Sequence, residues 1–237
     1  MSGERGRGPG RRPIIIAIEG IDGSGKTLQQ KMLSDRLRMN GYKTLELSFP
    51  RYGGFFGKEI GRMLTGETGR GADRVDARSM ALWYALDRFD AVNNIDMDAY
   101  DYCVVNRYVM SNMAYQGLRL AGGEPDGDGF IAAARWIYEL EHVALGLPVP
   151  DVYIFLRVDA AASHRNMDKK GPRDYISGGR DVYESDAVFL KGVGRAYLRL
   201  CADYGAHTVS CARDGAMFAP EAINDGIYNI IQGVKTT

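Results

Sequence analysis

A glycine-rich stretch near the N-terminus, EGIDGSGKT (Glu19 to Thr27), constrains the fold more than any other feature of the chain. It follows IIIAI, a short β-branched run typical of a buried parallel strand, and it precedes helical spacing of apolar residues over 26–39. Residues 20–27 match the pattern G-x-x-x-x-G-K-[ST] in full. Glycines let backbone N–H groups converge on phosphate oxygens, and a helix N-terminus adds partial positive charge. The sequence therefore predicts a nucleotide-phosphate site at this strand–helix junction.

The motif also predicts roles for individual side chains. Lys26 can reach the β- and γ-phosphates, and Thr27 can offer its hydroxyl group to Mg²⁺. We therefore expect the phosphates to be bound by the whole loop: Gly20, Ile21, Asp22, Gly23, Ser24, Gly25, Lys26 and Thr27.

Apolar patterns along the rest of the chain predict strands that alternate with helices. Such alternation implies right-handed β–α–β crossovers and a parallel sheet covered on both faces, an α/β fold. Gly, Arg and Pro dominate residues 1–13, which we expect to be a disordered leader, with a nucleic-acid-binding arm as the alternative. No linker divides 14–237, which is interpreted as a single domain. The predicted strands are 13–18, 43–49, 101–106, 151–158 and a weak one at 207–211; the predicted helices are 26–39, 57–64, 77–95, one opening at 111, 128–145, 186–204 and 220–234.

Composition excludes several classes of protein. The 237 residues include 30 Lys and Arg and 30 Asp and Glu, so the formal net charge is zero. A basic excess is usual in proteins that act mainly on nucleic acid, which is therefore not expected as a main partner. No apolar run approaches the roughly 20 residues of a membrane-spanning helix. The cysteines (Cys103, Cys201 and Cys211) are odd in number and lack CxxC spacing, which favours reduced core cysteines in a cytosolic protein.

The most polar and irregular stretch is HRNMDKKGPRDYISGGRD, residues 164–181. It contains several glycines and prolines, and its cations are Arg165, Lys169, Lys170, Arg173 and Arg180. In an otherwise neutral protein, such a segment indicates a mobile basic lid that covers a bound anion. The alternative is a solvated surface loop.

A further group of residues is arranged to receive a second ligand. Tyr84 and Arg88 are spaced i,i+4, so a flat ring and a cation share one helix face. Arg107 lies at the carboxyl end of the third strand, where open α/β sheets bind ligands, and Asn112 and Tyr115 follow on the next helix. A ring for stacking, polar groups for base edges and a cation for a phosphate together indicate a nucleotide acceptor.

The motifs EGIDGSGKT, FPRY, ALDR, NRYVMSNMAYQ, LGLPVPD and DVYESD occur in the order and spacing of thymidylate kinases, and the chain resembles this family from residue 14 to its last helix. The resemblance implies a P-loop kinase fold with a five-stranded parallel sheet, flanking helices and a lid at about 164–181. It implies the reaction ATP + dTMP → ADP + dTDP, with Mg²⁺ as cofactor and ATP as donor, in a cytoplasmic enzyme that is usually a homodimer.

The resemblance also assigns residues by position. Lys26 and the loop amides would bind ATP, Tyr84 would stack on thymine, Arg88 would contact its O4 atom, and Asn112 its N3 atom. Tyr115 resembles the residue that excludes a ribose 2′-hydroxyl group. The positions that would hold the acceptor sugar and phosphate are Phe49, Tyr52, Arg107 and Tyr183, together with Asp22; the metal ligands would be Thr27, Asp22 and Glu184. Taken singly, Tyr84 and Tyr115 could equally be core aromatic residues, and Arg88 could form a surface ion pair.

Two features of the chain bear on catalysis: one departure from the family pattern, and the absence of a basic residue from the variable positions of the glycine-rich loop. Asn106 stands where the family usually has aspartate, and an amide cannot supply negative charge to a metal or to Arg107. The variable loop positions from Ile21 to Ser24 contain no arginine, so Arg165, Arg173 and Arg180 are candidates to act with Lys26 and Arg107 in catalysis. The alternatives are a related nucleoside or nucleoside-monophosphate kinase with another acceptor, and a weakly active nucleotide-binding homologue.

Overall fold

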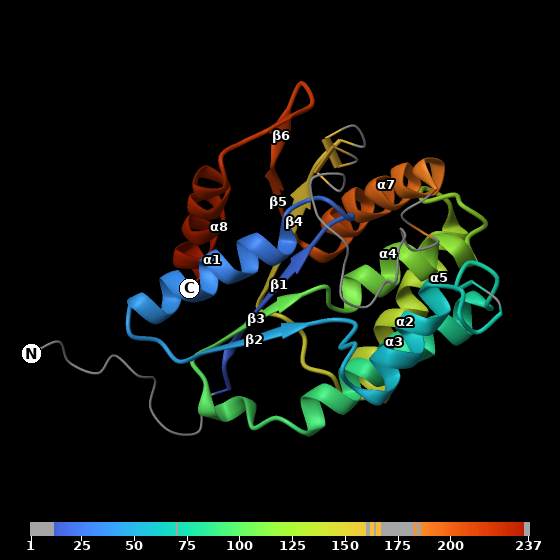
Figure 1. Ribbon diagram of the computed structural model, residues 1–237, viewed down its shortest axis with the longest axis horizontal. Helices are drawn as coiled ribbons and strands as arrows, with labels where there is room; N and C mark the ends of the chain where they lie inside the picture. The colour runs from blue at the N-terminus through green and yellow to red at the C-terminus, as the bar shows by residue number, and fades with distance from the viewer. Residues whose placement is uncertain are drawn as a thin grey trace, which may run out of the picture.

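The computed structural model describes residues 12–69, 71–159, 162–163, 165–166, 183 and 186–234. Five parallel strands form the central sheet in the order β2-β3-β1-β4-β5, which confirms the predicted sheet (Figure 1). The strands are β1 (Ile14–Glu19), β2 (Thr44–Ser48), β3 (Tyr102–Asn106), β4 (Val152–Arg157) and β5 (His207–Ser210). Because all five run in the same direction, their carboxyl ends meet at one edge of the sheet, where loops can form a ligand site.

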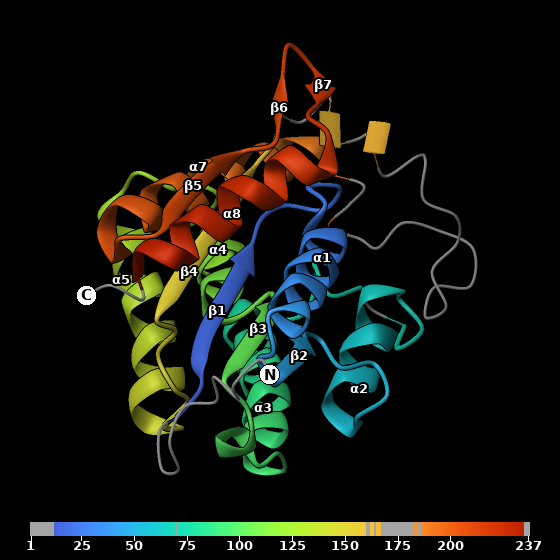
Figure 2. The same cartoon turned by 90° about the vertical axis from the view of Figure 1, so that its left-hand side faces the viewer.

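Helices cover both faces of the sheet, and Figures 1 and 2 show α1 and α8 together on one face. The described helices are α1 (Lys26–Met39), α2 (Phe55–Leu64), α3 (Ala77–Asn93), α4 (Val109–Leu120), α5 (Asp128–Tyr138), α7 (Ala187–Tyr204) and α8 (Pro220–Val234). Short 3₁₀ and π turns, η1 (Met97–Ala99) and η2 (Glu139–Ala144), follow α3 and α5. The predicted bounds of α1 and α8 are confirmed.

Alternate residues of β1 supply two hydrophobic cores. Ile14, Ile16 and Ile18 pack with residues of α1 and α8 on one face. Ile15 and Ala17 belong to the larger core on the other face, which includes residues of α2, α3, α4, α5 and α7. Every residue of β1 is buried, as expected for a strand covered on both faces.

Several boundaries differ from the predictions: α2 begins at Phe55 rather than at residue 57, and α3 ends at Asn93 rather than at residue 95. Helix α4 begins at Val109 rather than at Ser111, because the Ser111 hydroxyl group is used inside the core, where it donates to Glu19 at 2.5 Å. The helix predicted over 128–145 is α5 followed by the π-helical η2. A hairpin of β6 (Ala212–Arg213) and β7 (Ala216–Met217) was not predicted; it projects beyond the carboxyl end of the sheet (Figure 2).

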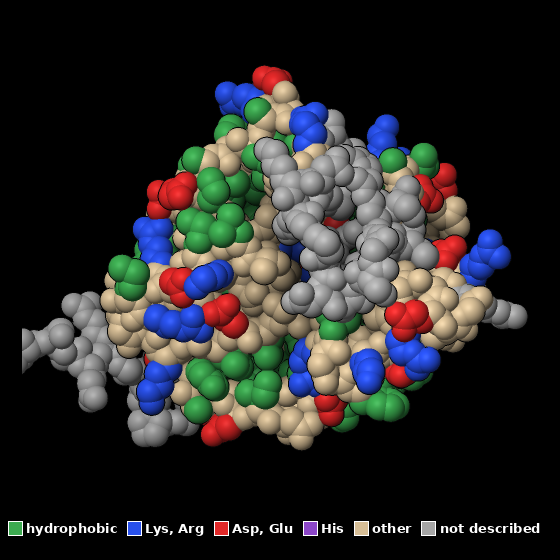
Figure 3. Space-filling model, viewed as in Figure 1, with side chains coloured by type: hydrophobic (Ala, Val, Ile, Leu, Met, Phe, Trp, Pro, Cys, Tyr) green, Lys and Arg blue, Asp and Glu red, His purple; other side chains and the backbone are tan. Residues whose placement is uncertain are grey.

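Charge on the surface is mixed. Lys and Arg side chains are interspersed with Asp and Glu side chains over the face seen in Figure 3, in keeping with the zero net charge of the chain. None of the described helices is both long and apolar enough to cross a membrane. At the N-terminal side, the Arg12 guanidinium donates to both carboxylate oxygens of Asp151 at 2.8 Å. The rest of the expected leader, residues 1–11, lies outside the described residues.

Candidate active site

A cavity of about 830 Å³ lies where the carboxyl ends of β1, β2 and β3 meet. Its size is typical of small-molecule sites. The cavity brings together most of the residues predicted for the two ligands: Asp22, Gly23, Gly25, Lys26, Thr27, Phe49, Tyr52, Tyr84, Arg88, Arg107, Asn112, Tyr115 and Tyr183. The remaining loop residues Gly20, Ile21 and Ser24 are not among its lining residues.

The glycine-rich loop adopts a backbone that side chains would obstruct. A Cβ atom on Gly20 would lie 2.7 Å from Ser24 Oγ and 2.9 Å from the carbonyl oxygen of Leu156. Gly25, the N-cap of α1, has a φ of +91° and leaves the first turn without a capping side chain. The amides of that turn therefore point to the space where a phosphate can bind. Lys26 Nζ donates to the carbonyl oxygen of Ile21 at 2.7 Å, which holds the lysine beside the loop.

Arg107 and Asp22 form an ion pair at the centre of the cavity. Arg107 Nη2 lies 2.6 Å from Asp22 Oδ1, and the Tyr115 hydroxyl group donates to Asp22 Oδ2 at 3.3 Å. Burial disfavours the charge of Arg107, but Asp22 and the neighbouring Tyr115 and Tyr197 together more than offset this effect, so the pKa of Arg107 is held well above its ordinary value. Arg107 has a φ of +63°, a conformation that is rare outside glycine and that aims its side chain from the end of β3.

Asn106, the residue that departs from the family pattern, touches the phosphate loop. Its Nδ2 atom donates to Thr27 Oγ1 at 3.3 Å. Its Oδ1 atom is buried and has no hydrogen-bond partner among the described residues. An unpartnered oxygen beside the threonine hydroxyl group leaves an acceptor available for a donor such as a water molecule.

The residues predicted to contact the base, Arg88 and Asn112, both donate hydrogen bonds to the buried carboxylate of Glu141. Glu141 accepts from Arg88 Nε at 2.5 Å and from Arg88 Nη2 at 2.7 Å, and it also accepts from Asn112 Nδ2 at 2.7 Å. Burial lowers the pKa of Arg88, but the charge and hydrogen bonds of Glu141 outweigh this effect, so its pKa is raised. Arg88 is therefore a buried ion-paired residue that lines the cavity, and not part of a surface ion pair.

Sequence reasoning missed Glu141 and a second buried acid, Glu19. Glu19 accepts from the amide of Tyr108 at 2.8 Å and from the hydroxyl groups of Ser111 and Tyr197. Burial raises the pKa of Glu19, an effect only partly offset by these bonds. Each acid carried a signal: Glu19 ends a continuous buried strand, and Glu141 continues the buried stripe of Phe130, Ala134 and Ile137.

The expected lid is described only in part. The Ser163 hydroxyl group donates to the carbonyl oxygen of Asp22 at 2.5 Å, and Asn166 Nδ2 donates to that of Gly23 at 2.8 Å. Arg165 does not line the cavity; its guanidinium contacts the Gly215 carbonyl oxygen in the β6–β7 hairpin. Arg173, Arg180 and Glu184 lie outside the described residues.

Tyr183 closes one side of the cavity as part of an aromatic cluster with Tyr115 and Phe189. Its hydroxyl group donates to the carbonyl oxygen of Ala72 at 3.1 Å and accepts from Arg119 Nη1 at 3.0 Å. Within the described part of the chain, no group of His, Cys, Asp and Glu has the composition of a metal cluster. Phosphate-bound Mg²⁺ does not require one, because it takes few protein ligands and keeps water and phosphate oxygens.

Comparisons with known proteins agree on one family. The family model described as thymidylate kinase matches residues 18–214. A thymidylate kinase of Mycobacterium tuberculosis is 38% identical over 195 residues, which cover 80% of this chain and 86% of the relative. A probable thymidylate kinase of Methanothermobacter thermautotrophicus is 33% identical over 201 residues, 84% of this chain and 87% of the relative. The solved structure of a thymidylate kinase from Candida albicans shares the fold, with a TM-score of 0.69 at 21% identity, over 94% of this chain and 93% of that chain.

Proposed function

The chain belongs to the thymidylate kinase family, and on this premise we propose that it transfers the γ-phosphoryl group of ATP to dTMP, giving ADP and dTDP. The observation that carries the proposal is the single cavity in which a phosphate-binding loop faces a base-reading pair. Lys26 and Thr27 of the loop line this cavity, and so do Arg88 and Asn112. A donor phosphate and an acceptor nucleotide can therefore meet within one cavity.

Residues of the chain would act by position and charge. The acceptor phosphate already ionises near pH 6, so the reaction needs no strong general base. Lys26 would hold the donor phosphates, and Arg107 would leave Asp22 in part to bind the acceptor phosphate. A basic group from the lid would add positive charge as the phosphoryl group moves. Before the substrates bind, Asp22 holds Arg107 in the cavity lining and the Ile21 carbonyl oxygen holds Lys26 beside the loop.

A magnesium ion fits the donor set at the mouth of the loop. Thr27 presents an exposed hydroxyl group, and Asn106 Oδ1 is the unpartnered buried oxygen next to it. Thr27 and Asp22 would hold the ion, with Glu184 as the further ligand expected from the family pattern. When bound, Mg²⁺ neutralises charge on the phosphate oxygens.

The family likeness further supports a homodimeric, cytoplasmic enzyme. Large apolar side chains remain exposed on α2 and α3 (Phe55, Leu82 and Phe89), where a second copy could cover them. Sedimentation velocity measures this association directly, and a monomer at micromolar concentration would contradict it.

An acceptor panel tests the proposed reaction. The wild-type chain is assayed for ADP formation with ATP, Mg²⁺ and dTMP, dUMP, dCMP or UMP. We expect kcat/KM to be highest for dTMP and modestly lower for dUMP, because burying one methyl group contributes about 1 kcal/mol. UMP should be a much poorer acceptor. Equal kcat/KM for dTMP and UMP would contradict the assignment, and activity confined to another nucleotide would favour a related kinase.

A further inference from the structure

Two residues that line the cavity, Arg88 and Asn112, have hydrogen-bonding groups that are fixed by buried partners. Asn112 is 3% exposed, and its Nδ2 atom donates both to the Ala81 carbonyl oxygen at 3.0 Å and to Glu141 at 2.7 Å. Its Oδ1 atom is buried without a partner among the described residues. The side chain cannot turn over, because the reversed amide would place its oxygen against two acceptors. Asn112 therefore offers the cavity an acceptor and no donor.

The hydrogen-bond donors of Arg88 are also restricted by Glu141. Its Nε and Nη2 atoms are both used by Glu141, and no described residue accepts a hydrogen bond from Nη1. A guanidinium has no acceptor, so the atom that remains can only donate. Both residues donate to the same oxygen, Glu141 Oε1, so one carboxylate leaves a donor on Arg88 and an acceptor on Asn112.

Glu141 is suited to impose this arrangement. It is fully buried and comes from η2, a π-helical turn that extends α5 beneath the base end of the cavity. A bidentate contact to a guanidinium has fixed geometry, which locks the direction of the arginine fork. π-Helical turns re-aim side chains and frequently mark functional sites. Glu141 does not line the cavity, so its influence passes through its two partners.

We propose that Glu141 is a positioning residue that sets base specificity, by orienting the donors of Arg88 and by holding Asn112 as an acceptor towards the acceptor base. This inference rests on the proposed function. Thymine and uracil present a carbonyl acceptor next to an N–H donor, which this pair complements. Cytosine presents an amino donor next to a ring-nitrogen acceptor. Its donor would therefore face the Arg88 donor, and its acceptor would face the Asn112 acceptor. The site therefore rejects cytosine by leaving buried polar groups unpaired.

The test is Glu141→Gln, with Glu139→Gln as the matched control. Glu139 lies in the same π turn and is exposed, so its variant makes the same change of charge without touching Arg88 or Asn112. In Glu141→Gln, the new amide can donate to Asn112, which removes one of the two acceptors that oppose reversal of the asparagine and leaves only the Ala81 carbonyl oxygen against it. We measure kcat/KM for dTMP and dCMP and the equilibrium binding of both nucleotides.

We expect the dTMP-to-dCMP ratio of kcat/KM to fall by about 10-fold or more in Glu141→Gln. The loss should arise chiefly in the acceptor KM, the KM for ATP should stay near that of the wild type, and Glu139→Gln should behave as the wild type. A ratio within about 2-fold of the wild-type value, however much activity is lost, would show a purely structural role.

A second variant keeps the proposal testable if Glu141→Gln does not fold. Glu141→Asp retains the charge that Arg88 requires, but its shorter side chain cannot reach both partners at hydrogen-bond distance. We expect it to lower the dTMP-to-dCMP ratio about 3-fold or more, and an unchanged ratio would overturn the inference. A wild-type chain that phosphorylates no thymidine nucleotide would instead refute the proposed function, so the two failures are distinguishable.

Discussion

At the scale of single residues, the site depends on polar atoms whose partners are already set in the protein. Arg107 and Asp22 pair at 2.6 Å, Arg88 and Glu141 pair at 2.5 Å, and Asn106 reaches Thr27 at 3.3 Å. Side chains held in this way already lie in the cavity lining when a charged substrate arrives. Substitutions that retain shape but change hydrogen bonding are therefore the most informative.

Asn106→Asp restores the residue usual in the family. The carboxylate can accept from the Thr27 hydroxyl group and adds negative charge next to the predicted metal site. We expect kcat with dTMP to stay level or rise, with the order of acceptors unchanged. Steady-state kinetics of both forms at matched Mg²⁺ and pH measure this. A large loss of kcat/KM would show that the site is adapted to the amide, since a carboxylate also repels an acceptor phosphate.

Tyr115 is predicted to exclude a ribose 2′-hydroxyl group by its bulk. Tyr115→Ala should raise kcat/KM for UMP relative to dTMP by about 10-fold, because the ring that fills this space is removed. Tyr115→Phe is the matched control: it removes the hydroxyl group, with its contact to Asp22, and keeps the ring. Unchanged discrimination in the alanine variant would place the sugar elsewhere in the cavity.

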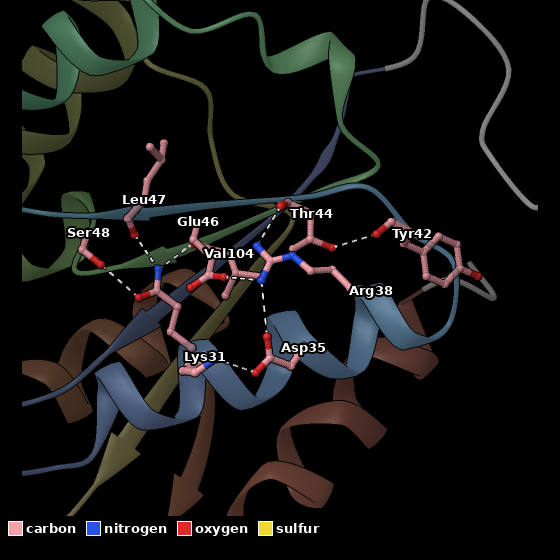
Figure 4. Close-up of polar contacts among 10 residues, drawn as sticks. Lys31, Asp35, Arg38, Tyr42, Thr44, Glu46, Leu47, Ser48 and Val104 are labelled. Carbon is pink, nitrogen blue, oxygen red and sulfur yellow. Dashed lines mark hydrogen bonds and ion pairs between the residues drawn. The ribbon is translucent and has the colours of Figure 1, made fainter.

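At the scale of elements, α1 connects the phosphate loop to the edge of the sheet. Figure 4 shows polar contacts from α1 to β2 and β3. Gln30, which is buried, donates to the carbonyl oxygens of Leu47 and Val104 and accepts from the Ser48 hydroxyl group. These contacts lie just before the residues of β2 and β3 that enter the cavity, so they stabilise the frame of the site.

Gln30→Met keeps the volume of this side chain but removes its hydrogen bonds. At about 1 kcal/mol for each bond, we expect the free energy of unfolding to fall by roughly 2–4 kcal/mol. Arg38→Ala is the comparison, because its ion pairs with Asp35 and Glu46 are half-exposed and should contribute less than about 1 kcal/mol. Urea unfolding followed by circular dichroism measures both. Equal losses for the two variants would contradict the assigned role of Gln30.

The lid gives a prediction for a whole segment. At least one of Arg165, Arg173 and Arg180 should act in the transition state, because the phosphate loop has no arginine. The corresponding alanine variant should lose about 10²-fold in kcat, with a smaller change in the KM for dTMP. In the described structure, Arg165 instead contacts the β6–β7 hairpin. Single variants with near-normal kcat at all three positions would leave the lid as a cover only.

Local patterns were sufficient for the elements that depend on local signals. Apolar spacing predicted α1 and α8 to the residue, and the β-branched runs predicted the five strands closely. The hairpin was missed because β6 and β7 have only two residues each and no hydrophobic pattern. Glu141 was missed because its partners, Arg88 and Asn112, lie on α3 and α4, so only the packed structure brings the three side chains together.

At the scale of the whole molecule, the parallel sheet places two chemistries on one edge. Residues of the loop after β1, which we propose to bind phosphates, line the same cavity as residues that follow β2 and β3, which we propose to bind the acceptor nucleotide. Hydrophobic cores on both faces of the sheet fix the strands and helices from which these loops extend. The central claim is therefore that phosphoryl transfer occurs directly between two nucleotides bound in one cavity.

The most direct test of this claim is ³¹P NMR of the products formed from ATP, Mg²⁺ and dTMP by the purified chain. The account predicts that ADP and dTDP accumulate in equal amounts, with little inorganic phosphate, and that Lys26→Met abolishes both products. Release of ADP and inorganic phosphate without dTDP, at the same rate with or without dTMP, would contradict it.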